Sequence, residues 1–529
     1  MSAPSAAPYA EVATPDDADV CASSGFDGAG AVLLLSCYEL GHQPFTVASP
    51  WAQLARAGFG VTGVDASIDP VDDAAIERAR LIAISVPMHT AVRLGSAFAE
   101  RIRARNPAAH ICLFGLYAAL NAEHLLERGV ADSVIGGEFE SALVELARAL
   151  ARGVDPRHVA GVTTRASLGS RMDSRDGGLA AAPVLRRLPF VLPRRDGLPA
   201  LDRYAHLIGP ARGESRVVGY LEASRGCLHR CLHCPITPVY AGRFFIVPRE
   251  IVLADAEQQI AAGARHLTFG DPDFFNGVGH SMAIARALHA AHPDVTFDVT
   301  TKVELILRHR EHLVELASLG CVFIVSAVES LSDRVLLELD KGHTRADVHE
   351  ALRVTREAGI PLRPSLVAFT PWTTLDDYLE LCDFIVEHGL EANVDPIQLA
   401  IRLLVPPGSA LLAEGRARSF PGLGPLVPGE FGHRWVHLDP AMDRLFDDVS
   451  RRVEEGTRSD EDAAVTFAAI RALAYRAADR EPLVLAPRAP RAFVPHLTEP
   501  WFCCAEPSRV QLDQIAAREG QRGEPGCCD

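Results

Sequence analysis

Two long stretches of the chain alternate short apolar runs with amphipathic segments, and this alternation constrains the fold more than any other feature. The first covers residues 30–150, where AVLLLSC, LIAISVP and HICLFGL are separated by segments such as TAVRLGSAFAERIRAR. The second begins near residue 216 and its rhythm stops after Pro406. Continuous apolar strands that alternate with helices are typical of parallel sheets covered on both faces. We therefore expect an α/β chain with two successive parallel-sheet domains.

The first stretch predicts a flavodoxin- or Rossmann-like parallel sheet over residues 30–150. Such sheets bind ligands at the carboxyl ends of their strands. The loops that would gather there read SCYELGHQP, SVPMHT, FGLYAALN and GGEFE. The pattern indicates a ligand-binding architecture and does not by itself identify the ligand.

The second stretch contains six strand–helix units and predicts a partial (β/α)6 TIM-type barrel over residues 216–410. In barrels of this kind the chemistry is carried by the loops that follow the strands. Residues 151–215, rich in Arg, Pro and Gly, predict a linker. Residues 411–529 predict a helical C-terminal region that ends in a cysteine-bearing tail. Residues 1–29 lack a basic and an apolar region, so we expect a disordered leader rather than a signal peptide.

Composition narrows the class of protein. The net charge of −16 disfavours a surface that coats nucleic acid. Hydrophobic residues make up 48% and charged residues 23%, an ordinary globular balance. The longest apolar runs, such as GAGAVLLLSCYEL, are too short to span a membrane. We expect a cytoplasmic protein, in which clustered cysteines bind metal or do redox chemistry more often than they form disulfides.

Three of the twelve cysteines lie within eight positions of the stretch ASRGCLHRCLHCPITP, residues 223–238. Cys227, Cys231 and Cys234 form the pattern C-x3-C-x2-C directly after the first strand of the predicted barrel. Three thiolates can hold three irons of a [4Fe-4S] cluster and leave the fourth iron open. A zinc ion with His229 or His233 as fourth ligand is the alternative, and plain structural cysteines are a second one.

The segment EASRGCLHRCLHCP resembles the signature of the radical SAM superfamily. The resemblance implies that the open iron binds the amino and carboxylate groups of S-adenosylmethionine (SAM). It also implies that an electron from the cluster cleaves SAM to methionine and a 5′-deoxyadenosyl radical, which abstracts hydrogen from a substrate carbon. The position before the last cysteine is usually aromatic in this family, and here it is His233.

Further segments resemble cofactor-binding parts of the same family and fall in the family's order. FGDPDFF follows the second barrel strand, in the place of a Gly-rich segment that meets the methionyl amino group of SAM. VSAVESLSD resembles the G-x-E-S signature of the fourth strand, whereas FTPWTT lacks the glycine and glutamate of the family's loop after strand five. The residues assigned to SAM in this way are Gly270, Asp271, Asp273, Ser326 and Glu329, with Lys302 and Arg402 as partners for its carboxylate.

The domain order resembles the branch of the superfamily that carries an N-terminal cobalamin-binding domain, and GGEFESALVEL resembles that branch's G-E-x-E ending. A domain that ligates cobalt through histidine uses D-x-H-x-x-G, and His42 lacks the preceding aspartate. Two alternatives remain open: cobalamin bound without a protein ligand on its lower face, or a sheet that serves as a lid or substrate platform.

The C-terminal tail carries two pairs of adjacent cysteines, Cys503–Cys504 in WFCCAEPSRVQL and Cys527–Cys528. Adjacent Cα atoms lie about 3.8 Å apart, below the usual disulfide window of about 4.4–6.8 Å. Such pairs suit redox exchange or capture of soft ions. WFCCAEP resembles the tail of the CUAEP/CCAEP-tail radical SAM (seleno)proteins, which implies a nucleophilic or redox role for Cys503 and Cys504. An uninvolved tail and a second cluster are the alternatives.

The sequence therefore predicts a radical SAM enzyme that modifies a small molecule by methylation or by forming a bond between carbon and sulfur, selenium or arsenic. The resemblance implies a flavodoxin or ferredoxin as electron donor. A non-enzymatic module that binds zinc or soft metals is one alternative. RNA methylthiolation is another, disfavoured by the acidic balance and by the lack of a basic C-terminal module.

Overall fold

The computed structural model describes most of the chain in two compact units. The first consists of Met1–Glu39 with Gln43–Pro199, and the second of Leu40–His42 with Ala200–Asp529. The boundary lies inside the predicted linker. No helix of the described residues is long and apolar enough to cross a membrane. The described residues are 25–168, 179–186, 189–209, 213–413, 416, 420–483 and 493–499.

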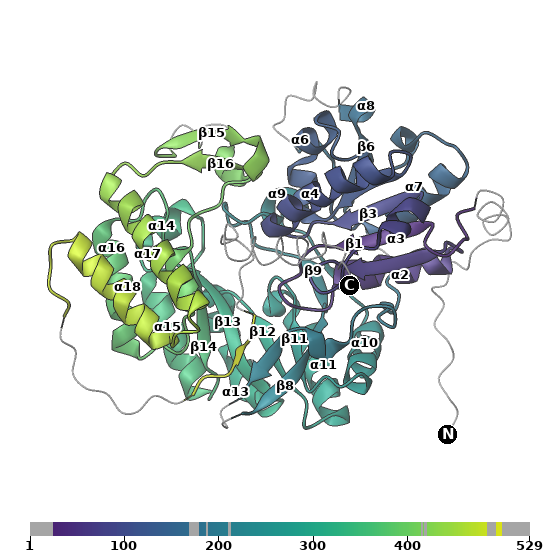
Figure 1. The fold of residues 1–529 in the computed structure, drawn as a ribbon. Helices are drawn as coiled ribbons and strands as arrows, with labels where there is room; N and C mark the ends of the chain where they lie inside the picture. Colours follow the sequence, from purple (N-terminus) through teal and green to yellow (C-terminus); the bar gives the residue numbers. More distant parts are fainter. Residues whose placement is uncertain are drawn as a thin grey trace, which may run out of the picture. The chain divides into compact units, whose positions relative to one another are not determined.

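The first unit is built on a six-stranded sheet with the strand order β2-β1-β3-β4-β5-β6 (Figure 1). The first five strands in the sequence run parallel, and β6 pairs antiparallel with β5. The order 2-1-3-4-5 is that of flavodoxin-like sheets, whose ligand crevice opens between β1 and β3. The strands are β1 (Val32–Ser36), β2 (Val61–Asp65), β3 (Leu81–Ser85), β4 (His110–Phe114), β5 (Ser133–Ile135) and β6 (Val162–Thr164). The helices are α2 (Phe45–Arg56), α3 (Asp73–Arg78), α4 (His89–Arg105), α5 (Leu116–Leu120), α6 (Ala122–Glu127), α7 (Glu140–Ala151) and α8 (Arg165–Leu168).

Burial explains why these segments form central strands. Every side chain of β1 and β3 is buried, as expected for strands covered on both faces. Parts of the predicted linker also belong to this unit. A Cβ on Gly197 would lie 2.2 Å from the Trp51 ring of α2, and Val184 bridges to Gly137 after β5. The linker is thus largely packed onto the first sheet.

The second unit contains a curled sheet with the order β14-β13-β12-β11-β8-β7-β17 (Figure 1). Five strands are parallel, and β7 and β17 extend the edge beyond β8 in antiparallel pairing. The strands are β7 (His206–Ile208), β8 (Ser215–Leu221), β11 (His266–Phe269), β12 (Thr296–Thr300), β13 (Cys321–Glu329), β14 (Leu362–Leu366) and β17 (His496–Leu497). The helices are α10 (Arg249–Ala261), α11 (Val278–Ala291), α12 (Val303–Arg308), α13 (Leu313–Ser318), α14 (Asp333–Glu338), α15 (Arg345–Glu357) and α16 (Leu375–His388). This is the partial barrel that the sequence predicts.

The sixth predicted strand is reduced to a single bridge between Phe369 and Arg402. The reason lies in the preceding residues, since Pro396–Ala400 form a 3-10 helix. The Gln398 side chain there accepts a hydrogen bond from the Leu366 backbone N–H at 2.9 Å. A side chain thus takes the place of the backbone partner that a sixth strand would offer to β14.

Residues 493–499, here called the C-terminal strap, connect the two edges of the curled sheet. Arg363 of β14 donates to the Pro495 carbonyl at 3.5 Å, and the next two residues pair with β7 at the other edge. The yellow strand in Figure 1 follows this path beside β13 and β14. Leu497 packs against Leu207, Val218 and Phe323. The strap therefore covers the β7 edge by strand pairing and contacts the β14 edge through one side-chain hydrogen bond.

A hairpin and two helices form the predicted helical C-terminal region: β15 (Leu423–Val427), β16 (Gly432–Trp435), α17 (Pro440–Arg458) and α18 (Ala463–Ala477). Helix α17 buries Met442, Leu445, Val449 and Val453, the three-to-four-residue spacing of one helical face. Helix α18 is tied to α16 because Arg471 donates to Asp383 at 2.8 Å. The region therefore packs as part of the second unit.

Candidate active site

The three-cysteine loop lies at the carboxyl end of β8, after the short strand β9 (Ser224–Gly226), which pairs with β10 (Phe244–Ile246). Gly226 has φ +72°, and a Cβ there would lie 2.5 Å from the Arg243 carbonyl oxygen, so only glycine fits. The Cys231 carbonyl accepts hydrogen bonds from the Cys234 N–H at 3.2 Å and from the Thr237 hydroxyl of α9 (Ile236–Tyr240) at 2.8 Å. The loop is thus held at several points.

Cys231 is buried, and Cys227 and Cys234 are half-buried. Burial raises the pKa of the Cys227 thiol, so its thiolate needs a positive partner. Among the described residues, no three His, Cys, Asp or Glu side chains converge on one metal position. A cubane does not require such convergence, because each cysteine binds a different iron.

A buried ion pair lies beside this loop. Lys341 Nζ is 3.1 Å from Glu329 Oε1, and His233 Nε2 is 3.3 Å from the same oxygen. Burial opposes both charges, yet Lys341 holds the pKa of Glu329 well below its usual range. The carboxylate, Cys231 and Cys234 likewise raise the pKa of Lys341 against its burial. A fixed cation thus faces two of the three cysteines, which fits the binding of an anionic thiolate cluster.

The backbone at Glu329 has an unusual conformation for a residue with a side chain. Its φ is +64°, and the pairing of β13 with β14 shifts register between Ala327 and Glu329. A positive φ is disfavoured for residues other than glycine and is found mainly where the surrounding structure enforces it. The irregular strand end directs the Glu329 side chain to Lys341 and His233.

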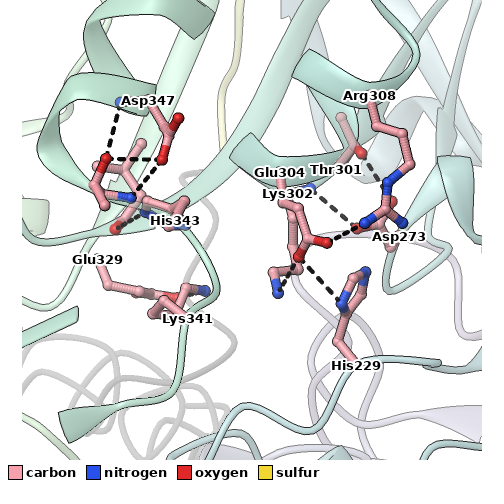
Figure 2. Close-up of polar contacts among 12 residues, drawn as sticks. His229, Asp273, Thr301, Lys302, Glu304, Arg308, Glu329, Lys341, His343 and Asp347 are labelled. Carbon is pink, nitrogen blue, oxygen red and sulfur yellow. Dashed lines mark hydrogen bonds and ion pairs between the residues drawn. The ribbon is translucent and has the colours of Figure 1, made fainter. Parts of the chain in front are cut away.

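Asp271 and Asp273 brace the loops of the site. Asp271 accepts from the Ala223 N–H at 2.9 Å and from the Ser224 hydroxyl at 2.5 Å. Asp273 accepts from the Thr301 hydroxyl at 2.7 Å and from the Lys302 N–H at 3.0 Å (Figure 2). Burial raises the pKa of Asp271 to about 7 and that of Asp273 to about 6. The described bonds of both carboxylates thus go to the protein rather than to an open site.

Gly270 is required by its neighbour. A Cβ at this position would lie 1.9 Å from the Tyr220 hydroxyl. The absence of a side chain therefore lets Tyr220 of β8 pass across the end of β11.

Glu304 of α12 is the centre of a second group of charges on the right of Figure 2. It lies 3.5 Å from Lys302 Nζ and 3.8 Å from His229 Nδ1, and it pairs with Arg308. Burial, followed by the charge of Lys302, lowers the pKa of His229 to about 4. Lys302 is buried and already has a carboxylate partner, and His229 is neutral at pH 7.

Two predicted cofactor contacts have buried polar atoms without a hydrogen-bond partner in the described part of the chain. These are His233 Nδ1 and Ser326 Oγ. His343 Nδ1, in the loop that carries Lys341, is a third such atom. Buried polar atoms normally have a partner, so these three mark where a bound molecule can supply one.

Arg402 contacts the C-terminal hairpin and α17. Its guanidinium lies 3.8 Å from the Trp435 ring centroid and donates to Asp443 of α17 at 2.9 Å and to the Trp435 carbonyl at 2.7 Å. The guanidinium is thus shared with β16 and α17, and the predicted contact with SAM stays a prediction.

Sequence reasoning gave no role to Lys341 and Glu304. Glu304 lies in the first turn of α12 and Lys341 in the loop after α14, both with other charges nearby, and no spacing rule distinguishes them. Their only sequence signal is proximity to assigned positions, since Glu304 follows Lys302 by two residues and Lys341 follows Glu329 by twelve. The tail residues Cys503 and Cys504 lie outside the described residues.

In the first unit, the carboxyl end of β1 presents Ser36, whose buried hydroxyl has no hydrogen-bond partner in the described chain. The turn after β5 is covered, because Val184 pairs with Gly136 and Glu138. His42 is buried, groups with the second unit, and has its ring 5.1 Å from that of Tyr220. His42 is therefore part of the barrel's packing.

Comparison with known proteins agrees with this geometry. Residues 221–393 match the radical SAM superfamily. The hopanoid C-3 methylase of Methylococcus capsulatus is 24% identical over 276 residues, 52% of this chain and 50% of the methylase. The ribosomal protein uS12 methylthiotransferase RimO of Phocaeicola vulgatus is 26% identical over 185 residues, 31% of this chain and 40% of RimO. The chain thus spans half or less of the length of these relatives.

Two solved structures have a similar fold. The cobalamin-dependent SAM radical enzyme OxsB, with aqua-cobalamin and SAM bound, has a TM-score of 0.62 at 15% identity and covers 82% of this chain and 67% of its own. The radical SAM methyltransferase TsrM of Kitasatospora setae has a TM-score of 0.53 at 18% identity and covers 68% of this chain and 71% of its own. The segment 221–393, which matches the radical SAM superfamily, contains Cys227, Cys231 and Cys234 at the end of the first barrel strand, so this part of the chain is a radical SAM domain.

Proposed function

We propose that this chain uses a [4Fe-4S] cluster, held by Cys227, Cys231 and Cys234, to cleave SAM reductively and modify a small molecule. The observation that carries the proposal is the fixed three-thiol loop beside the buried cation Lys341. When bound, the cluster supplies the electron for cleavage and an open iron for the methionyl group of SAM.

The chain's own residues then hold and orient the nucleotide. Asp271 and Asp273 fix the loops after β8, β11 and β12 through their backbone hydrogen bonds. Ser326 Oγ and His233 Nδ1 are the acceptors and donors available to the ribose or adenine. Lys302 is the cation that we assign to the SAM carboxylate, and its ion pair with Glu304 keeps it in place.

Methylation is the reaction that the relatives favour. The hopanoid C-3 methylase and TsrM are methyltransferases by name, and RimO is a methylthiotransferase that acts on a ribosomal protein. The acidic net charge of −16 weighs against an RNA substrate for this chain. A small-molecule substrate is therefore the proposal, with flavodoxin or ferredoxin as electron donor.

Cobalamin is proposed as a second cofactor, in the crevice between β1 and β3, with no histidine of this chain on cobalt. The support is the flavodoxin-like strand order and the Ser36 hydroxyl at the crevice, which has no hydrogen-bond partner among the described residues. The His42 ring packs against Tyr220 of the barrel instead. When bound, cobalamin supplies a methyl carrier. Ser36 would hold it through a hydrogen bond at the end of β1.

Cys503 and Cys504 are proposed to act as a nucleophile or as a two-electron dithiol at the barrel mouth. The strap supports this role, because β17 pairs antiparallel with β7 and so runs in the direction of β8, toward the cysteine loop. Cys503 follows Glu499 by four residues, a reach of at most about 14 Å.

Anaerobic reconstitution tests the proposal. The protein, loaded with iron and sulfide and given SAM and a reductant, is expected to absorb broadly near about 400 nm and to release 5′-deoxyadenosine or S-adenosylhomocysteine. Iron, sulfide, cobalt and zinc are counted on the same sample. A colourless zinc protein, or a fully loaded cluster that forms neither product, would overturn it. A His42→Ala variant is measured in the same way. If it retains cobalt and its absorbance spectrum is the same as that of the wild type, the result supports cobalamin bound without that histidine.

A further inference from the structure

A cavity of about 40 Å³ lies between the curled sheet and the strap. Its walls are side chains of β12, β13 and β14, the loop after α16, and the strap. The charged residues among them are Asp298, Asp395 and Glu499 against Arg363, which are three carboxylates and one guanidinium. The lining residues of the cavity therefore carry more negative than positive charge.

Asp298 is the residue that makes this cavity more than a packing defect. It is 2% exposed, and its Oδ1 accepts hydrogen bonds from the Thr268 hydroxyl at 2.7 Å and lies 2.9 Å from His266 Nε2. The Oδ2 atom has no hydrogen-bond or ion-pair partner among the described residues. A buried carboxylate oxygen without a donor is costly, so the cavity wall presents an acceptor that needs one.

Two other lining residues also direct acceptor oxygens that lack partners in the described chain. The Asn393 side chain donates from Nδ2 to the Leu362 carbonyl at 2.8 Å, which leaves its Oδ1 available. Asp395 uses Oδ2 for Arg363 at 3.0 Å and has no contact at Oδ1. Arg363 itself is taken up by Asp395 and by backbone carbonyls. The cavity thus offers acceptors, and its one cation is already paired.

We propose that this cavity binds the ammonium group of an amine-containing substrate, with Asp298 Oδ2 as the charged acceptor. A positively charged N–H donor forms the strongest hydrogen bonds to a carboxylate. A cavity of about 40 Å³ exceeds the roughly 10–15 Å³ that one water requires in this measure, so it has room for an ammonium group and the carbon that carries it. The proposal rests on the proposed function and specifies the substrate class of that same barrel.

The position of Asp298 suits a substrate that reacts at the barrel mouth. Asp298 lies two residues before Thr300, the carboxyl end of β12, which is a rise of about 7 Å. The cysteine loop lies at that end, after β8.

The experiment uses the full-length, cluster-loaded protein and n-butylammonium chloride as probe, followed by ligand-observed NMR. Sodium butyrate, n-butanol and sodium chloride at equal concentration are the controls for charge sign, shape and ionic strength. The variants are Asp298→Asn, which keeps the shape, and Ser365→Leu, which fills the cavity from β14. Asp376→Asn, an exposed carboxylate of α16, is the matched control. Circular dichroism and cluster absorbance verify that each variant is folded and loaded.

We expect saturable binding of the amine alone, weakened about tenfold or more by Asp298→Asn, abolished by Ser365→Leu and unchanged by Asp376→Asn. Equal binding to the wild type and to Asp298→Asn, equal binding of butyrate, or no saturable binding would overturn the proposal and leave a water-filled void. Wild-type SAM cleavage is measured on the same preparation. Amine binding without cleavage of SAM would contradict the proposed function and leave this inference standing. Cleavage of SAM without amine binding would overturn this inference and leave the proposed function standing.

Discussion

Lys341 Nζ and Glu329 Oε1 lie 3.1 Å apart, and both side chains are almost completely buried. The pair belongs to a loop and to an irregular strand end, and the lysine faces the thiols of Cys231 and Cys234. Removing one partner of a buried ion pair leaves the other charge without compensation. The pair therefore gives the site a charge arrangement that single substitutions should disturb strongly.

Lys341→Met is expected to lower the free energy of unfolding of the apo-protein by about 3–5 kcal/mol, because Glu329 remains buried and charged. The double variant Lys341→Met/Glu329→Gln should recover most of that loss, since neither charge remains. Urea unfolding of the three proteins gives the values. Additive losses in the double variant would show that the two side chains do not depend on each other.

Cys231→Ala is expected to prevent assembly of an intact cluster and to abolish SAM cleavage. The reason is that the remaining two thiols cannot hold three irons. Iron and sulfide analysis, with absorbance of anaerobic protein, measures the effect.

Cys382→Ala is the matched control for that variant. Cys382 is a fully buried thiol of α16, and burial raises its pKa to about 12. It lies in α16, a different segment of the chain from the cysteine loop, so the iron content of the variant should remain at the wild-type level. A similar loss of iron in both variants would point to a general effect of losing a buried thiol.

Asp271 predicts a pH dependence of stability. Burial raises its pKa from an ordinary 3.8 to about 7, so the folded protein holds a proton that the unfolded chain releases. This contribution is complete below about pH 4 and is lost as the pH rises through about 7. Each unit of pKa shift corresponds to about 1.4 kcal/mol, so up to about 4 kcal/mol is involved.

The comparison that isolates this effect is wild type against Asp271→Asn, in urea unfolding from pH 5 to pH 8. As the pH rises, the free energy of unfolding of the wild type should fall relative to that of the Asp271→Asn variant. A constant difference across that range would mean that Asp271 is charged throughout in the folded protein.

Arg402→Met is expected to destabilise the protein by about 1–3 kcal/mol without weakening SAM binding. The guanidinium stacks on Trp435 and pairs with Asp443, so its loss removes a contact between the barrel and α17. Equilibrium dialysis with SAM and urea unfolding separate the two effects. Weaker SAM binding at unchanged stability would restore the role that the sequence predicted for Arg402.

Two truncations separate the strap from the tail. A chain that ends at residue 499 should keep the stability of the full protein, whereas one that ends at residue 492 should lose about 2–3 kcal/mol, because Leu497 leaves its site against Phe323. The chain that ends at residue 499 lacks Cys503 and Cys504, so it should lose only the reaction step that depends on this dithiol. Equal stability of both truncated chains would show that the strap does not close the barrel.

The sequence predicted both parallel sheets, the partial barrel and the cysteine loop, because each of these has a local signal. Buried runs such as VLLLS identify strands, and the spacing of Cys227, Cys231 and Cys234 identifies the cluster loop. The sixth strand that the sequence predicted is only a single bridge in the structure. The residues IQLAIRLL have a strand-like composition, and the tertiary bond from Gln398 to Leu366 replaces the pairing.

Roles of single charged residues were harder to predict than their locations. The sequence correctly placed Asp271 and Asp273 after β11, yet their oxygens are used by the backbone of neighbouring loops. Arg402 lies next to the barrel and turns toward α17, which no local pattern reveals. Likewise, β17 has two residues, and only its pairing with β7 makes it a strand.

The strap has a consequence for how the protein is made. Residues 221–393, which include the cysteine loop, leave the ribosome about 100 residues before the strap does. At about 5–20 residues per second, the half-barrel spends roughly 5–20 s without its closing strand. Iron and sulfide delivery in the cell therefore has a window in which the nascent sheet is still open at one edge.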